Sequence, residues 1–120
     1  MLFFTKPLKI YLFKDRNVVN FNIKVSNNAV NAYELTIADF ENLLENWRKQ
    51  DGIELKINNN HWHVQWKKRG PRPRCEVVDY VKISVSTNTG QTFHYRVDFI
   101  DMHEMQQEYF YQKNNKMYWD

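Results

Sequence analysis

Hydrophobic and polar residues alternate with a period of two in residues 8–13 and again in residues 19–25. This period is typical of β-strands, because successive side chains point to opposite faces of a sheet. The polar residues Asp15–Asn17 lie between the two segments and favour a turn. The pattern therefore predicts a β-hairpin, and we expect a loop over residues 26–31.

The period then changes to that of a helix. Thr36 is a favourable N-cap, and Asp39 stands three residues later, in place of the usual Glu of a capping box. Gly52 can adopt the left-handed conformation that ends many helices. We predict a helix from Thr36 to about Gln50. Its apolar face consists of Ile37, Phe40, Leu43, Leu44 and Trp47.

Period-two alternation returns in residues 53–57 and 62–66, which predict a second hairpin. Bringing their apolar faces to the same side gives the pairs Ile57–Trp62 and Leu55–Val64. This register leaves a two-residue turn at Asn59–Asn60, where a type I′ turn requires the positive φ that Asn tolerates.

A third hairpin is predicted from residues 81–85 and 93–99, joined by a loop at Asn88–Gly90 with Gly90 in the left-handed conformation. Its register gives the pairs Ser84–His94 and Lys82–Arg96. Asp101 then caps a second helix, with Glu104 as its capping-box partner. The core side of this helix carries Met102, Met105 and Tyr109, with Phe110 as a further candidate. The tail over residues 114–120 is expected to fray.

The predicted order is ββαββββα over residues 1–120, a single α+β domain. Short connections favour one antiparallel sheet of about six strands, with both helices packed on one face. The predicted core consists of Phe40, Leu44, Trp47, Trp62, Trp66, Val81, Ile83, Tyr95, Val97 and Phe99.

Composition supports a folded protein, because 42% of the 120 residues are hydrophobic and 16% are aromatic. The single cysteine, Cys75, excludes an intramolecular disulfide and favours a reducing compartment. No segment resembles a signal peptide or a membrane span, so we expect a cytoplasmic protein without a membrane partner. Abundant Asn, Lys, Tyr and Phe are typical of AT-rich genomes, such as those of low-GC bacteria, their phages and mobile elements.

Positive charge is concentrated in one segment, residues 61–74. The chain has 17 basic and 14 acidic residues. Five of the basic residues lie in this segment, which contains no acidic residue. These five are Lys67, Lys68, Arg69, Arg72 and Arg74. Basic side chains neutralise phosphates without reading sequence, which indicates a nucleic-acid backbone as ligand. The alternative is a charged turn that only faces solvent.

The sheet face opposite the helices is the second candidate surface. Its predicted residues are Lys56 beside His63, with His61, Gln65, Lys67, Lys82, Ser84, His94 and Arg96. Lys82 opposite Arg96 is a like-charge pair, which is unfavourable in a sheet and which an anion or the diagonal Asp98 would relieve. An ordinary solvated face, with Asp98 screening the pair, is the alternative. Trp62 and Trp66 alternate with the polar residues of this strand and fall on its apolar side with Val64. We therefore assign them to the core rather than to stacking against nucleic-acid bases.

Catalytic or metal chemistry has weak support. His61 and His63 have a spacing that can bind zinc, with His94 as a third ligand, but no fourth ligand is evident. Cys75 follows arginines that favour its thiolate, yet no nucleophile signature surrounds it. We therefore expect no metal, no cofactor and no enzyme activity.

Acidic residues gather on the second predicted helix, where Asp101, Glu104 and Glu108 line one edge. This edge either faces solvent or meets a basic partner protein. Two functions follow. The first is a non-catalytic protein that binds the nucleic-acid backbone. The alternative is a small phage or mobile-element protein that inhibits or regulates a partner protein, such as a nucleic-acid enzyme.

Overall fold

The computed structural model describes residues 7–26, 28–67 and 80–114. In chain order its elements are β1 (Leu8–Phe13), a short 3-10 helix (Lys14–Arg16), β2 (Val18–Ser26), β3 (Ala29–Thr36), α1 (Ile37–Asn46), β4 (Ile53–Ile57), β5 (Asn60–Lys67), β6 (Tyr80–Ser86), β7 (Thr92–Asp98) and α2 (Phe99–Asn114).

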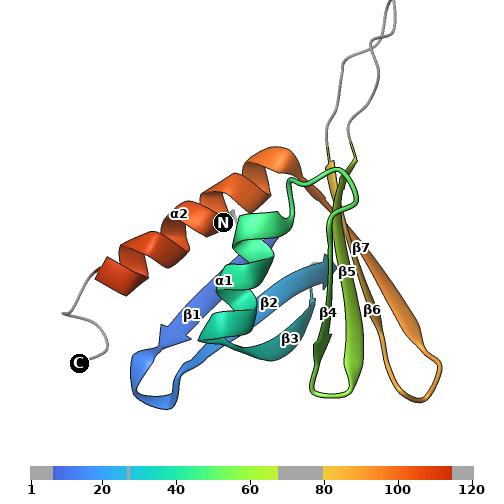
Figure 1. Cartoon of the computed structure of the whole chain (residues 1–120), viewed down its shortest axis with the longest axis horizontal. Coiled ribbons are helices and arrows are strands. Elements are labelled where there is room, and N and C mark those ends of the chain that lie inside the picture. The colour runs from blue at the N-terminus through green and yellow to red at the C-terminus, as the bar shows by residue number, and fades with distance from the viewer. Residues whose placement is uncertain (1–6, 27, 68–79, 115–120) are drawn as a thin grey trace, which may run out of the picture.

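The α+β class is confirmed, but the strands form two antiparallel sheets rather than one. The first sheet has the order β1-β2-β3, and the second has the order β4-β5-β6-β7. Figure 1 shows the sheets set at an angle, with both helices on the same side of the four-stranded sheet. The chain changes sheets at α1, because β3 pairs with β2 and β4 begins a new set of hairpins.

The strand β3 was missed in the sequence, where its first three residues were assigned to the loop over residues 26–31. The first half of β3 reverses the usual pattern, because the polar Asn31 lies on the inner face while Val30 on the outer face is 53% exposed. Asn31 Nδ2 donates a 2.6 Å hydrogen bond to the Tyr95 hydroxyl, which also contacts the hydroxyl of Tyr33. The Tyr95 hydroxyl, which belongs to the other sheet, lets Asn31 occupy an inner position.

The helix starts were predicted with unequal success. Thr36 is confirmed as the N-cap of α1, since its Oγ1 accepts a 3.1 Å hydrogen bond from the Asp39 N–H. The helix ends at Asn46 rather than at Gln50, and turns lead on to β4. The second helix begins at Phe99, so Asp101 lies in its first turn and is not its N-cap.

One of the two argued registers was right. The pairs Ser84–His94 and Lys82–Arg96 are confirmed. The β4–β5 register was wrong by two residues, because Leu55 pairs with Trp62 and the turn is Asn58–Asn59, with φ of 50° and 67°. A shift of two residues leaves every side chain on its predicted face, since the side-chain period of a strand is two.

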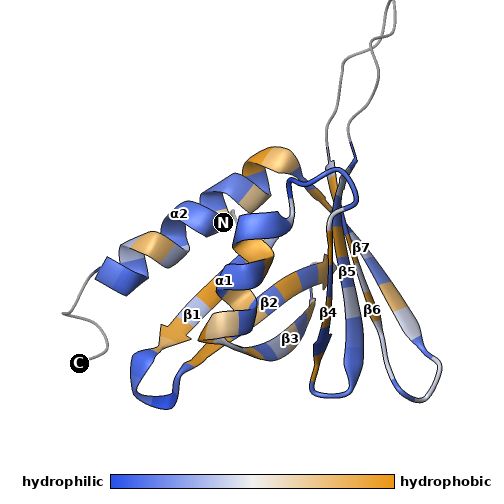
Figure 2. Ribbon diagram, viewed as in Figure 1, coloured by the Kyte–Doolittle hydropathy of each residue, from blue (hydrophilic) through white to orange (hydrophobic). Residues whose placement is uncertain are grey.

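One core joins the two sheets. Trp62 of β5 is 1% exposed and stacks against Phe21 of β2, with 6.0 Å between ring centroids, while Tyr33 of β3 meets it edge-on at 4.9 Å. The predicted core residues all face this interior, although Trp66 and Phe99 are only partly buried. Figure 2 shows the alternation of hydrophobic and hydrophilic positions along the strands.

Polar contacts fix α2 against α1. The Tyr109 hydroxyl donates a 2.6 Å hydrogen bond to Glu41 Oε2, and Lys113 Nζ lies 2.7 Å from the same oxygen. The hydrogen bonds from Lys113 and then from Tyr109 lower the pKa of Glu41. Burial, followed by the bond to Glu41, raises the pKa of Tyr109. Within the described part of the chain, no helix is both long and apolar enough to cross a membrane.

Candidate anion-binding face and an acidic groove

The outer face of the four-stranded sheet is the face that α1 and α2 leave uncovered (Figure 1). Pairing across β5, β6 and β7 sets its side chains in rows that run across the strands. The three rows nearest the ends of β5 and β7 are His63–Ser84–His94, Gln65–Lys82–Arg96 and Lys67–Tyr80–Asp98.

The basic end of this face is formed by Lys67, Lys82 and Arg96, which lie in adjacent rows. The Arg96 guanidinium lies over the Tyr80 ring, 3.9 Å from its centroid. A stacked guanidinium keeps the N–H donors on its edge available for an anion. The sequence analysis missed Tyr80, although the register that it predicted for this hairpin places Tyr80 diagonally beside Arg96.

The turn before β4 covers part of the same face. Gly52 has a φ of 69°, and a Cβ atom at this position would lie 2.1 Å from the Val64 carbonyl oxygen. Only glycine permits this approach, which brings two carbonyl groups of the turn onto β5. His63 Nε2 donates to the Asp51 carbonyl at 3.2 Å, and Gln65 Nε2 donates to the Gln50 carbonyl at 3.3 Å.

The pairing predicted for Lys56 was wrong, because the β4–β5 register is shifted. Lys56 lies opposite His61, and Glu54 lies opposite His63. His61 Nε2 is 3.6 Å from Glu54 Oε1. Lys56 is therefore two rows away from the basic end of the face, next to an acidic side chain.

The three histidines do not converge on one point. His94 Nδ1 is 3.0 Å from Ser84 Oγ, whereas His61 and His63 contact groups on the β4 side of the sheet. The described residues contain no group of three or more His, Cys, Asp or Glu side chains placed to hold a metal ion. Cys75 lies outside the described residues.

The other basic residues of the predicted loop, Lys68, Arg69, Arg72 and Arg74, also lie outside the described residues. The segment that contains them joins Lys67 at the end of β5 to Tyr80 at the start of β6. In the covalent chain this segment thus adjoins the row that holds Lys67, Tyr80 and Asp98.

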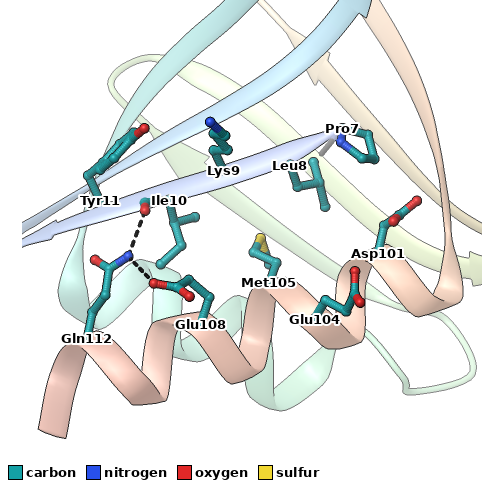
Figure 3. Close-up of a pocket in the computed structure, with 10 residues that line it drawn as sticks. All are labelled: Pro7, Leu8, Lys9, Ile10, Tyr11, Asp101, Glu104, Met105, Glu108 and Gln112. Atoms are coloured by element: carbon teal, nitrogen blue, oxygen red, sulfur yellow. Dashed lines mark hydrogen bonds between the residues drawn. The ribbon is translucent and has the colours of Figure 1, made fainter. Parts of the chain in front are cut away.

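The three predicted acidic residues come together in a groove between β1 and α2, of about 240 Å³. Figure 3 shows Asp101, Glu104 and Glu108 along the helix, with Pro7 at one end of the groove and Gln112 at the other. The strand wall of this groove was not foreseen, because sequence patterns do not show which strand lies beside a helix.

The sequence-predicted residues therefore occupy two separate surfaces, a basic one on the outer face of β5–β7 and an acidic one along α2. Comparison of the chain with protein-family models, with curated proteins and with solved structures finds no match.

Proposed function

We propose that this is a non-catalytic protein that binds the phosphate backbone of nucleic acid through the outer face of β5–β7. The observation that carries the proposal is the pair Lys82 and Arg96, which lie directly opposite each other on exposed sheet surface. Like charges in this position repel each other and cost free energy. A phosphate group between them would neutralise both, so the face is more stable with an anion bound.

The geometry of Arg96 supports a phosphate more than a monatomic anion. Its guanidinium rests on Tyr80, so less side-chain freedom is lost when its N–H groups engage two oxygens of one phosphate. Lys67 in the next row adds a third cation. Asp98 lies opposite Tyr80 in that row and limits the positive surface on one side.

Binding of this kind depends on charge and not on base sequence. In the part of the chain that the structure describes, no helix lies on the outer face to enter a major groove, and the face offers lysine and arginine side chains beside small polar ones. Affinity then comes from release of counterions and falls steeply as salt concentration rises.

The test is binding to a mixed panel of single- and double-stranded DNA and RNA, measured by fluorescence anisotropy over a range of salt concentrations. The variant K82Q/R96Q removes two phosphate contacts, and each contact contributes about 0.7 to 0.9 to the log–log salt slope. We expect the slope to decrease by about 1.4 to 1.8 and the low-salt affinity to fall.

The matched control is R16Q. Arg16 also stacks on an aromatic ring, with 4.6 Å to the centroid of Phe13, but it lies in the β1–β2 turn, away from the outer face of β5–β7. Binding by R16Q should have the wild-type slope. No binding to any panel member at low salt, or equal slopes for all three proteins, would contradict the proposal.

A further inference from the structure

The strand β1 has an open edge. Among the described strands it pairs only with β2, on one side, since the sheet order is β1-β2-β3. The Lys24 N–H donates to the Pro7 carbonyl at 2.8 Å, which fixes the phase of the pairing. Every second residue from Pro7 thus points its backbone groups toward β2. The N–H and C=O groups of Leu8, Ile10 and Leu12 point the other way, toward the groove beside α2.

One side chain of α2 occupies part of this edge. Gln112 Nε2 donates to the Ile10 carbonyl at 2.9 Å, and its Oε1 accepts from the Leu12 N–H at 2.8 Å. The amide group therefore makes the two hydrogen bonds that a peptide group of a neighbouring strand would make. Gln112 is buried, and Figure 3 shows it at one end of the groove.

The part of the β1 edge that precedes the Gln112 contacts in the chain has no such partner among the described residues. Within the described residues, the Ile10 N–H and the Leu8 carbonyl have no hydrogen-bond partner. Leu8 is 4% exposed and Ile10 is 2% exposed, so their backbone groups have little access to bulk solvent except through the groove. Unpaired backbone groups in such a place favour a ligand with complementary N–H and C=O groups.

The opposite wall of the groove gives the charge of that ligand. Asp101, Glu104 and Glu108 contribute three carboxylates, and among the described residues that line the groove Lys9 is the one cation. Glu108 Oε2 already accepts a 2.8 Å hydrogen bond from Gln112 Nε2, which holds it beside the strand edge. The excess of carboxylates favours a cationic side chain and repels nucleic acid.

We infer that the groove between β1 and α2 binds an extended segment of a partner protein that carries lysine or arginine side chains. Only a polypeptide supplies both the alternating backbone groups that the strand edge lacks and a cation for the carboxylates. A second copy of this chain fits poorly, because pairing β1 with β1 would bring two acidic grooves together. The inference does not rest on nucleic-acid binding, which uses the other surface.

The first test is selection of binders from a displayed library of random ten-residue peptides, with the wild-type protein as target. We expect selected peptides to be enriched in Lys or Arg at alternate positions. Their affinity should fall at least about tenfold in E104K and stay within about twofold in the matched control E45K, an exposed glutamate of α1. K82Q/R96Q should bind the peptides as the wild type does, which separates this site from the basic face.

The second test addresses the backbone. N-methylation of the selected peptide on alternate residues should abolish binding in one of the two possible phases and leave the other unchanged. Binding should also slow hydrogen exchange of the Ile10 amide. Selected peptides without basic residues, equal affinity for E104K and E45K, or equal binding by both N-methylated peptides would overturn the inference.

Discussion

The two charged surfaces are built differently, and the difference indicates what each can bind. Two of the three strands that carry the outer face of β5–β7, β5 and β6, are paired on both sides, and β7 lies at the edge of the described sheet. The basic end of that face offers side chains, chiefly Lys67, Lys82 and Arg96. The groove beside β1 offers acidic side chains together with backbone groups that have no partner within the described residues.

A surface that offers only charged side chains selects a partner by the sign of its charge. The basic outer face of β5–β7 therefore suits a repeating phosphate backbone. A surface that combines charge with an open strand edge selects both the sign of the partner's charge and the kind of polymer. The acidic groove beside β1 therefore suits a basic polypeptide. One small domain therefore presents two surfaces of opposite sign that need not compete for the same ligand.

The largest expected effect concerns the core that supports both surfaces. Trp62→Ala should lower the free energy of unfolding by roughly 3–5 kcal/mol, because a fully buried aromatic side chain leaves a large cavity. Its ring contacts Phe21 and Tyr33 of the other sheet, so the loss weakens the junction between the sheets. Urea denaturation measures this. Trp66→Ala should cost less, because Trp66 is partly buried, and a larger loss for Trp66→Ala would contradict this view of the core.

A smaller effect separates the two surfaces. Gln112→Ala should lower the free energy of unfolding by roughly 2–4 kcal/mol, because it leaves two buried backbone groups of β1 without partners. The matched control is Gln65→Ala on the basic face, where an exposed hydrogen bond is lost and less than about 1 kcal/mol is expected. Similar losses for the two variants would mean that the Gln112 amide does not close the strand edge.

The smallest expected effect is on the basic face. Tyr80→Leu removes the ring beneath Arg96 and should weaken nucleic-acid binding by about two- to fivefold, the value of an exposed cation–π contact. Tyr80→Phe keeps the ring and should bind as the wild type does. Anisotropy titrations at one low salt concentration measure both variants. Equal affinity for the two would show that Arg96 does not depend on the ring.

Regular alternation made the four-stranded sheet readable from the sequence. Val81, Ile83 and Val85 are apolar at every second position, and Gly90 marks the turn, so strands, faces and the Lys82–Arg96 pair could be predicted. The β4–β5 turn was harder, because three consecutive asparagines allow more than one two-residue turn with positive φ. The apolar pattern could not choose between registers that differ by two residues.

The three-stranded sheet and the groove could be predicted only in part. The strand β3 places Asn31 inside, where a hydroxyl group from a distant strand is its partner, and no local pattern reveals that partner. The spacing of the acidic residues of α2 in the sequence predicted that they line one edge of the helix. Their position beside β1 depends on how the helix crosses a strand that is distant in the chain, as the contacts of Gln112 with Leu12 and Ile10 show, at sequence separations of 100 and 102.

The most direct test of the central proposal is an NMR titration of the isotope-labelled protein with the oligonucleotide that binds best in the panel. We expect shifts in the Arg96 side-chain Nε–H signal and in the backbone amides of the rows that hold Lys67, Lys82 and Arg96. The amides of Leu8 and Ile10, in the acidic groove, should not move. Shifts confined to β1 and α2, with the Arg96 signal unchanged, would contradict the assignment of nucleic-acid binding to the outer face of β5–β7.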